Sequence, residues 1–246
     1  MFNYQIIIEY LGTNFVGWQI QKNGNSIQST IQKALSKALK KSIKINGSGR
    51  TDAGVHAKGQ SANFLFSQEI KDKFKFLNTV NFFLKNKSIS ITHIRKKNIK
   101  FHARFSAKKK IYKYIILNRP TISPIYKNRS WLIKKKLDIN KMKKAIKYFS
   151  GTHNFSSMRA SSCSAINPIR TITKSKIMKK GEKIIITFES KSFLQKQVRS
   201  MVGCLKFVGE KKWTLKKFNF VMNSKKRILC APPAPPEGLY LVRVIY

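Results

Sequence analysis

A single carboxylate within a glycine-rich loop, Asp52, is the residue whose setting most strongly suggests chemistry. The loop spans residues 47–57 and carries Arg50 two positions before the acid, in a chain with only nine acidic residues. Glycine lets the backbone come close to a ligand, and an arginine can lower the pKa of a nearby carboxylate and contact a phosphate. The loop could therefore present an ionised carboxylate to RNA. On local grounds alone, an Asx-turn or a helix cap with a surface ion pair is the simpler interpretation.

Two tyrosines interleaved with lysines form a second pattern. Tyr112 and Tyr114 lie within the lysine-rich stretch 108–114, on a strand expected over residues 110–117. Side chains alternate along a strand, so both rings are expected on the same face. Aromatic rings among cations suit base stacking combined with phosphate attraction. Ordinary strand packing explains the tyrosines equally well, and a solvated face explains the lysines.

One arginine, Arg199, stands inside an otherwise apolar segment that is expected to form a helix over residues 193–208. A charge at such a position is costly unless it reaches solvent or meets an anion. Asp52 is the most attractive anion in the chain.

Other kinds of site are not indicated. The chain has no phosphate-binding GxxxxGK[ST] sequence, and residues 47–49 lack the third glycine of a dinucleotide-binding loop. No carboxylates are paired for metal-dependent nuclease chemistry, and the histidines at 56, 93, 102 and 153 lack metal-ligand spacing. We therefore expect neither a metal nor a cofactor. His56 could face RNA, but a role in packing the loop is the better interpretation.

The elements that position these residues fall into two halves, 1–104 and 105–246, with the boundary near Arg104. In the first half we expect a helix whose capping box pairs Asn25 with Gln28. In the second we expect a helix capped by Asp138 and ending before Gly151. The other expected elements are strands at 4–10, 43–45, 61–66, 89–94, 110–117, 171–178, 184–189 and 239–246, helices at 27–39, 74–84 and 193–208, a smaller helix after 213, and an extended loop at 231–238. This order indicates an α/β or α+β protein.

Composition points to a polyanionic partner. The 246 residues include 51 Lys and Arg, and the formal charge is +42, which is strongly repulsive for a compact chain without a polyanion. Nucleic acid is the leading partner, because no long apolar run or lipidation signal suggests a membrane. The chain begins with a strand-like segment rather than a signal or transit peptide, so we expect a cytoplasmic protein.

The cysteines are expected to be inert. Cys163, Cys204 and Cys230 are odd in number, scattered, and lack CxxC spacing. Neither a disulfide framework nor a zinc site is suggested, and reduced, buried thiols are the expectation.

Several ordered motifs agree with one known family. They occupy residues 12–19, 49–57, 101–107 leading to Tyr112 and Tyr114, 193–203, and the ending 231–241. Over nearly its whole length the chain resembles the tRNA pseudouridine synthase A family. Asn154 stands where that family usually has Asp, which leaves the loop at 49–57 untouched.

The resemblance implies roles for four residues. Asp52 would be the catalytic aspartate, Tyr112 would stack on the target base, and Arg199 would pair with Asp52 to hold it ionised. Arg50 would help to extrude the target nucleotide or hold its backbone.

The resemblance also implies a fold and a substrate. The fold would be α+β, with two ferredoxin-like halves forming a largely antiparallel sheet and a central RNA-binding cleft. The substrates would be uridines at positions 38, 39 and 40 in the anticodon stem-loop of tRNA, modified without a cofactor by a homodimer. The alternative is a non-catalytic basic protein that binds or chaperones RNA, which would hold tRNA without forming product.

Overall fold

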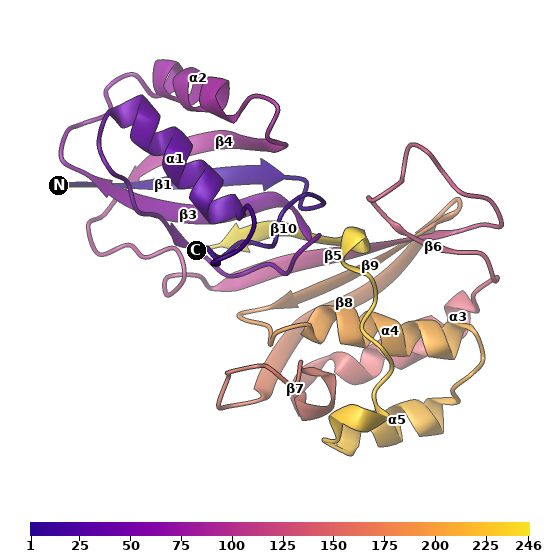
Figure 1. The fold of residues 1–246 in the computed structure, drawn as a ribbon. Coiled ribbons are helices and arrows are strands. Elements are labelled where there is room, and N and C mark those ends of the chain that lie inside the picture. Colours follow the sequence, from indigo (N-terminus) through magenta and orange to yellow (C-terminus); the bar gives the residue numbers. More distant parts are fainter. The chain divides into compact units, whose positions relative to one another are not determined.

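Two units divide the chain in the computed structural model, which describes residues 1–246 (Figure 1). The first unit contains residues 1–108 and 240–246, and the second contains 109–239. The final strand thus belongs with the first unit, whereas the sequence had grouped residues 105–246 together. The reason is a strand pairing, because Tyr240 and Leu241 align in parallel with His56 and Ala57.

The first unit is a mainly antiparallel sheet with two helices on one face (Figure 1). The strand at residues Phe2–Tyr10 lies between two long neighbours and is antiparallel to both. The order across the sheet is β4 (Ile89–Lys97), β1 (Phe2–Tyr10), β3 (His56–Phe66) and β10 (Leu239–Ile245), with β2 (Asn46–Gly47) also pairing with β3. The helices are α1 (Ile27–Leu39) and α2 (Lys73–Leu84).

Strand alternation separates an apolar face from a polar one. The even-numbered residues Tyr4, Ile6 and Ile8 of β1 are fully buried, as are Ile27 and Ile31 of α1. Burying large apolar side chains in this way supplies most of the stabilisation of a core. The helices therefore cover the even face of β1 and leave the odd face to other partners.

Helix α1 is capped by a different residue than expected. Its N-cap is Ser26, whose Oγ accepts a hydrogen bond from Ser29 N at 3.1 Å. Asn25 O instead accepts a hydrogen bond from Val16 N, and the Gln28 side chain donates to Ile45 O. The expected Asn25 and Gln28 capping box is wrong, because Gln28 N donates to Trp18 O and the Gln28 side chain is bonded to Ile45.

Two strand boundaries also differ from expectation. Ile43 and Ile45 are buried, but Asn46 and Gly47 form the short strand. Strand β3 starts at His56 rather than Ser61, so the end of the glycine-rich loop already lies in the sheet.

The second unit repeats the plan of a sheet with helices on one side (Figure 1). Its four main strands pair antiparallel in the order β5 (Lys109–Asn118), β9 (Lys183–Ser190), β8 (Ile169–Lys180) and β7 (Gly151–Asn154), and β6 (Trp131–Ile133) pairs parallel with β5. The helices are α3 (Ile139–Ile146), α4 (Gln197–Gly209) and α5 (Leu215–Asn223).

Three ends in the second unit refine the expectations. Asp138 caps α3 as predicted, with its carboxylate accepting from Lys141 N at 3.0 Å. The helix then tightens into the 3₁₀ turn Lys147–Phe149, and Gly151 opens a strand. Helix α4 begins at Gln197 rather than at residue 193, because Lys196 takes a left-handed conformation with φ of 59°. The 231–238 segment is extended only to residue 235 and ends in the 3₁₀ turn Pro236–Gly238.

Buried amides on the odd face of the first sheet hold the segment 98–106. Asn3 Nδ2 donates to Phe101 O at 2.8 Å and to Asn98 O at 3.1 Å. Asn63 Nδ2 donates to Asn3 Oδ1, and Asn63 Oδ1 accepts from Ala103 N at 2.9 Å. Both amides are almost completely buried, so each of these bonds satisfies groups that water cannot reach.

We predict that Asn63→Leu lowers the free energy of unfolding by about 1–3 kcal/mol, because Ala103 N and the Asn3 amide lose buried partners. Urea denaturation followed by circular dichroism measures the change. Leu65→Ala is the control, because Leu65 lies on the same strand and is 45% exposed. Equal midpoints for wild type and Asn63→Leu would contradict the role of the amide.

Candidate active site

Asp52 opens a tight turn. Val55 N donates to Asp52 O at 3.2 Å, and Gly54 has a φ of +77°. A positive φ at the third residue only is the mark of a type II turn, which favours glycine there. Asp52 is half-buried, and Arg50 is exposed. The turn thus places the carboxylate at a partly open position with a cation two residues away.

A second loop packs its backbone directly against this turn. Trp18 N donates to Thr51 O at 3.0 Å. Gly17 has a φ of +110°, and a Cβ atom there would lie 2.7 Å from Thr51 O. At Gly12 a Cβ atom would lie 2.0 Å from Val55 O. The two loops can approach this closely only because both positions are glycine.

His56 serves the contact between the two loops. Its ring is fully buried, and Nδ1 accepts from Gly12 N at 3.0 Å. The ring also lies 4.8 Å from that of Tyr240, measured between centroids. Because Nδ1 must offer a lone pair, it carries no proton. The expectation that His56 packs the loop is confirmed.

Buried polar side chains of the first unit bond to residues 48–51 of the glycine-rich loop. Tyr10 OH and Thr51 Oγ1 share a hydrogen bond of 2.8 Å. Gln60 accepts from Ser48 Oγ at 2.7 Å and donates to Gly49 O at 2.9 Å. Burial raises the pKa of Tyr10 well above its ordinary value, so the hydroxyl keeps its proton.

Sequence reasoning missed Tyr10 and Gln60. A signal was present, because Gln60 alternates with the apolar residues Ala62 and Phe64 and therefore shares their buried strand face. A buried amide at such a position needs partners, and here the partners belong to the loop before the strand.

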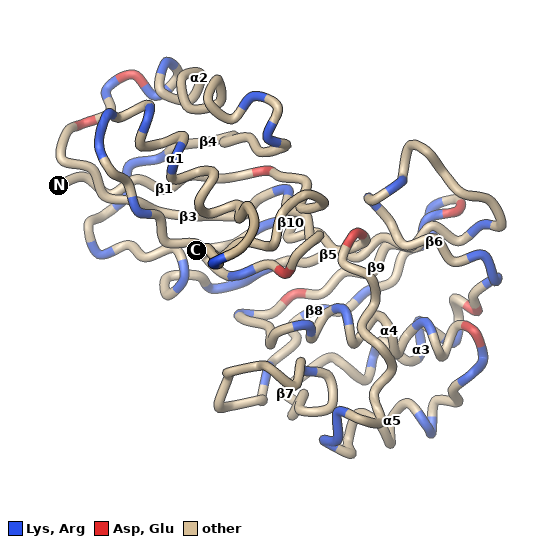
Figure 2. Tube along the Cα trace, in the orientation of Figure 1, with Lys and Arg blue, Asp and Glu red and all other residues tan.

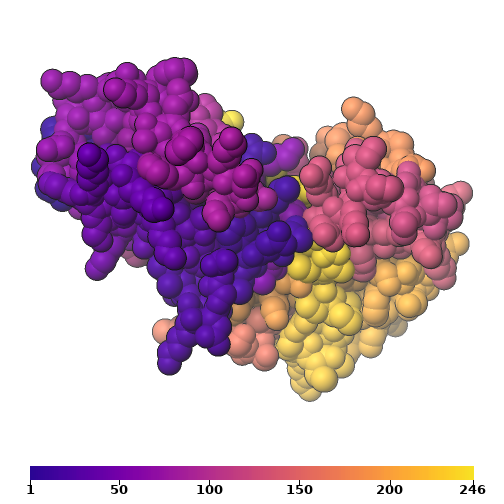
Figure 3. Space-filling model, turned by 45° about the horizontal axis from the view of Figure 1, so that its top comes forward, coloured from indigo at the N-terminus to yellow at the C-terminus, as the bar shows by residue number.

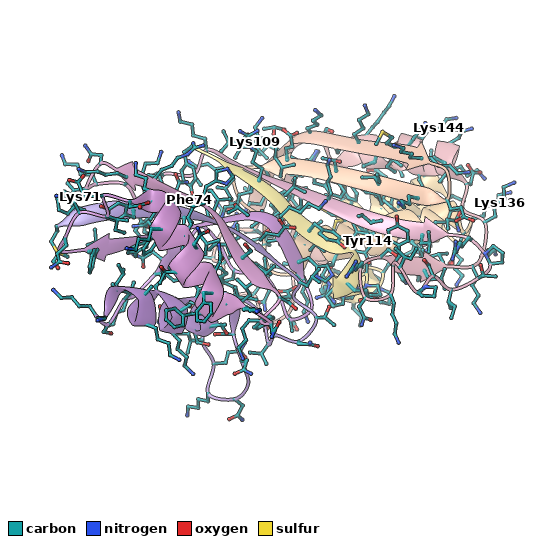
Figure 4. All side chains as sticks on the ribbon, turned by 90° about the horizontal axis from the view of Figure 1, so that it is seen from above. Lys71, Phe74, Lys109, Tyr114, Lys136 and Lys144 are labelled. Atoms are coloured by element: carbon teal, nitrogen blue, oxygen red, sulfur yellow. The ribbon has the colours of Figure 1, made fainter.

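The two tyrosines of β5 have different surroundings in the second unit. Tyr114, labelled in Figure 4, is fully buried, and its hydroxyl donates to Pro235 O at 2.8 Å. A Cβ atom at Gly238 would lie 2.5 Å from the Tyr114 ring. Tyr114 is therefore a packing residue. The ring of Tyr112 meets Phe193 edge to face, with centroids 5.2 Å apart.

Arg199 lies in the first turn of α4 and is half-buried. Its Nε donates to Ala234 O at 2.7 Å, and Ala234 N donates back to Arg199 O at 2.9 Å. These two bonds join α4 to the 231–235 segment and set the direction of the guanidinium.

The four residues named from the sequence are divided between the units. Asp52 and Arg50 lie on one loop of the first unit, and Tyr112 and Arg199 lie in the second. The pairing of Arg199 with Asp52, and the stacking of Tyr112 on a base, stay predictions.

Lysine and arginine residues occur throughout both units, and acidic residues are few (Figure 2). One acid can therefore pair with more than one cation. Glu189 pairs with Lys109 at 3.1 Å and with Lys174 at 3.7 Å. Lysines such as Lys71, Lys136 and Lys144 extend from the surface in Figure 4. Most of the positive charge thus has no acidic partner within the chain, where Lys and Arg number 51 and acids nine.

Neither a cluster of metal-ligating residues nor a membrane-spanning helix is found in the structure. No group of three or more His, Cys, Asp or Glu residues is placed to hold a metal ion. None of the helices combines the length and apolar character needed to cross a bilayer.

Comparison with known proteins decides the family. The model of the tRNA pseudouridine synthase family matches residues 6–106 and 145–246. The chain belongs to this family. A tRNA pseudouridine synthase A from Pelagibacter ubique (strain HTCC1062) is 58% identical over 246 residues, which cover the whole of both chains. One from Ehrlichia canis (strain Jake) is 42% identical over 244 residues, or 99% of each chain.

The resemblance read from the motifs is therefore confirmed, as is an α+β fold with mostly antiparallel strands. Among solved structures, a chain in the crystal structure of a Cbf5-Nop10-Gar1 complex has a TM-score of 0.39 and 12% identity, covering 82% of this chain and 44% of that one.

We predict that Gly17→Ala lowers turnover on tRNA at least about tenfold, which corresponds to roughly 1.4 kcal/mol. The added methyl group would displace Thr51, next to Asp52, while tRNA affinity stays unchanged. Single-turnover rates and filter binding measure the two quantities. Gly181→Ala is the matched control, because Gly181 also has a positive φ but no atom within 4 Å of a Cβ position. Equal rates in the two variants would contradict the positioning role.

Proposed function

We propose that this chain isomerises uridine to pseudouridine at positions 38, 39 and 40 in the anticodon stem-loop of tRNA. The observation that carries the proposal is the full-length identity of 58% with a tRNA pseudouridine synthase A. The built support around Asp52 agrees with it, because both buried polar groups and close glycine contacts converge on that loop.

The reaction needs no energy carrier. The bond from N1 of uracil to C1′ of the ribose breaks, the base rotates, and a bond forms from C5 to C1′. An ionised carboxylate can attack C1′ as a nucleophile or remove the C2′ proton. Either step requires Asp52 at the same place beside the ribose. A loop whose Thr51 and Gly49 are bonded to Tyr10 and Gln60 is suited to keep it there.

The other three residues complete the proposed site. Arg199 pairs with Asp52, and its bond to Ala234 O fixes the orientation of the guanidinium. Tyr112 stacks on the target base, with Phe193 against its ring. The exposed Arg50 helps to extrude the nucleotide or holds its backbone. Extrusion costs a few kcal/mol of lost stacking, which base stacking on an aromatic ring can offset.

The positive net charge supports tRNA as the partner. The formal charge of +42 favours a polyanion, and phosphate contacts by Lys and Arg supply affinity that does not depend on base sequence. We place the enzyme in the cytoplasm, where it acts as a homodimer without a cofactor.

Asp52→Asn should abolish tritium release from tRNA labelled at uracil C5, because forming the new carbon–carbon bond expels that hydrogen. The affinity for tRNA should stay within a few-fold of wild type, since backbone contacts dominate binding. Glu9→Gln is the control, because Glu9 is an exposed acid of the same unit. Normal release by Asp52→Asn would overturn the assignment.

The same assay separates the alternative, a basic protein that only binds or chaperones RNA. If the chain were such a protein, its wild type would bind tRNA tightly and in a salt-sensitive manner but would release no tritium.

Tyr112→Ala should lower turnover at least about tenfold, because stacking on one base contributes about 1–3 kcal/mol. Tyr148→Ala is the control in the same unit, because Tyr148 is 40% exposed and has no proposed role in the site. Thermal denaturation of both variants checks that the loss of contact with Phe193 has not unfolded the protein. Equal turnover in the two variants would argue against stacking by Tyr112.

A further inference from the structure

Two cysteines that stand far apart in the sequence meet in the second unit. The Sγ atoms of Cys204 and Cys230 lie 3.4 Å apart, although 26 positions separate the residues. Cys204 lies on α4 and is fully buried, whereas Cys230 follows the 3₁₀ turn Arg227–Leu229 and is half-buried. Cys163 is a third free thiol and has no sulfur partner. From the sequence we expected all three to be reduced, buried thiols.

The surrounding backbone holds this pair together. The segment after Cys230 is bound to α4 by the two hydrogen bonds between Arg199 and Ala234. It packs so closely that a Cβ atom at Gly203 would lie 2.1 Å from Pro232 O. A disulfide has an S–S distance of about 2.05 Å, so the sulfurs need to close by only about 1.4 Å.

The two thiols differ in acidity. A hydrogen bond from Cys204 and the nearby Arg227 guanidinium lower the pKa of Cys230. The Cys204 thiol, as the donor in that bond and as a buried group, has a pKa well above its usual value. The thiolate is the reactive form, and Cys230 is also the more accessible of the two. Figure 3 shows the C-terminal segment, in yellow, reaching the surface.

We propose that Cys204 and Cys230 form an oxidisable dithiol site that takes hydroperoxides and closes to an intramolecular disulfide. The Cys230 thiolate attacks one peroxide oxygen, the O–O bond breaks, and the released hydroxide takes a proton to become water. The Cys204 sulfur then attacks the Cys230 sulfenic acid, the S–O bond breaks, and the Cys204 proton leaves with the hydroxyl group as a second water. Two thiols and one hydroperoxide thus give one disulfide, and hydrogen peroxide gives two waters.

Closure would add a covalent bond between α4 and Cys230, the residue directly before the 231–235 segment. This is the same segment that orients Arg199, so the oxidised form holds that arginine more firmly. A disulfide between Cys204 and Cys230 joins residues 26 positions apart and thereby restricts the unfolded chain. We therefore expect a rise in Tm of roughly 5 °C.

The experiment treats the folded, full-length protein with a small excess of hydrogen peroxide. Remaining thiols are then alkylated with N-ethylmaleimide in denaturant, and peptides are identified by mass spectrometry. Wild type and Cys163→Ser should both give the peptide linking Cys204 to Cys230, and Cys163 in wild type should stay alkylated. Cys230→Ser should give no link and no rise in Tm. Cys204→Ser should stop at a sulfenic acid on Cys230, trapped by dimedone.

Two outcomes would overturn the proposal. One is full alkylation of all three cysteines in oxidised wild type, since that would mean the pair does not react. The other is a disulfide that includes Cys163 or joins two chains, because it would show that the 3.4 Å pair is not the preferred site. Reversal of the link and of the Tm shift by dithiothreitol separates a disulfide from irreversible oxidation. Tritium release is not a readout here, so failure of this proposal leaves the proposed isomerisation untouched.

Discussion

The first unit depends on one close contact between two backbones. Trp18 N bonds to Thr51 O, and glycines at 12 and 17 let the loop at 11–18 lie directly against the turn that begins at Asp52. Side-chain bulk at either position would separate the loops. The backbone before Asp52 is held further, because Tyr10 bonds to Thr51 and Gln60 bonds to Gly49. A catalytic group gains most from such prior positioning, since misplacement by about 1 Å can cost a hundredfold in rate.

In the second unit, Arg199 is positioned by hydrogen bonds to an extended segment. The extended segment 231–235 is rich in proline, which supplies no amide donor, yet Ala234 within it provides both a donor and an acceptor to Arg199. The segment is held further by the bond from Tyr114 OH to Pro235 O and by the contact of Pro232 with Gly203. The thiols of Cys204 and Cys230 lie at the start of this same attachment. Neighbouring residues of the second unit therefore decide where Arg199 points.

Much of the fold follows from local patterns. Alternating apolar residues located the long strands, and Asp138 and the apolar face of α4 were correctly read. The errors fall at element ends, where several local choices are nearly equal. Asn25 and Ser26 are both good N-caps, and the choice of Ser26 came from a tertiary bond between Asn25 O and Val16 N. In the same way, the left-handed conformation of Lys196 delayed the start of α4 by four positions.

The sequence by itself indicated the family and, through that resemblance, the α+β class. It also supplied the candidate residues Asp52, Arg50, Tyr112 and Arg199 and the preference for a polyanion. These depend on residue type, order and composition, which are present in the chain before it folds. Only the tertiary structure decided that Tyr114 packs while Tyr112 meets Phe193, that residues 240–246 join the first unit, and that two of three cysteines touch. Each of those facts joins residues far apart in the chain, and local periodicity carries no information about which distant residues will meet.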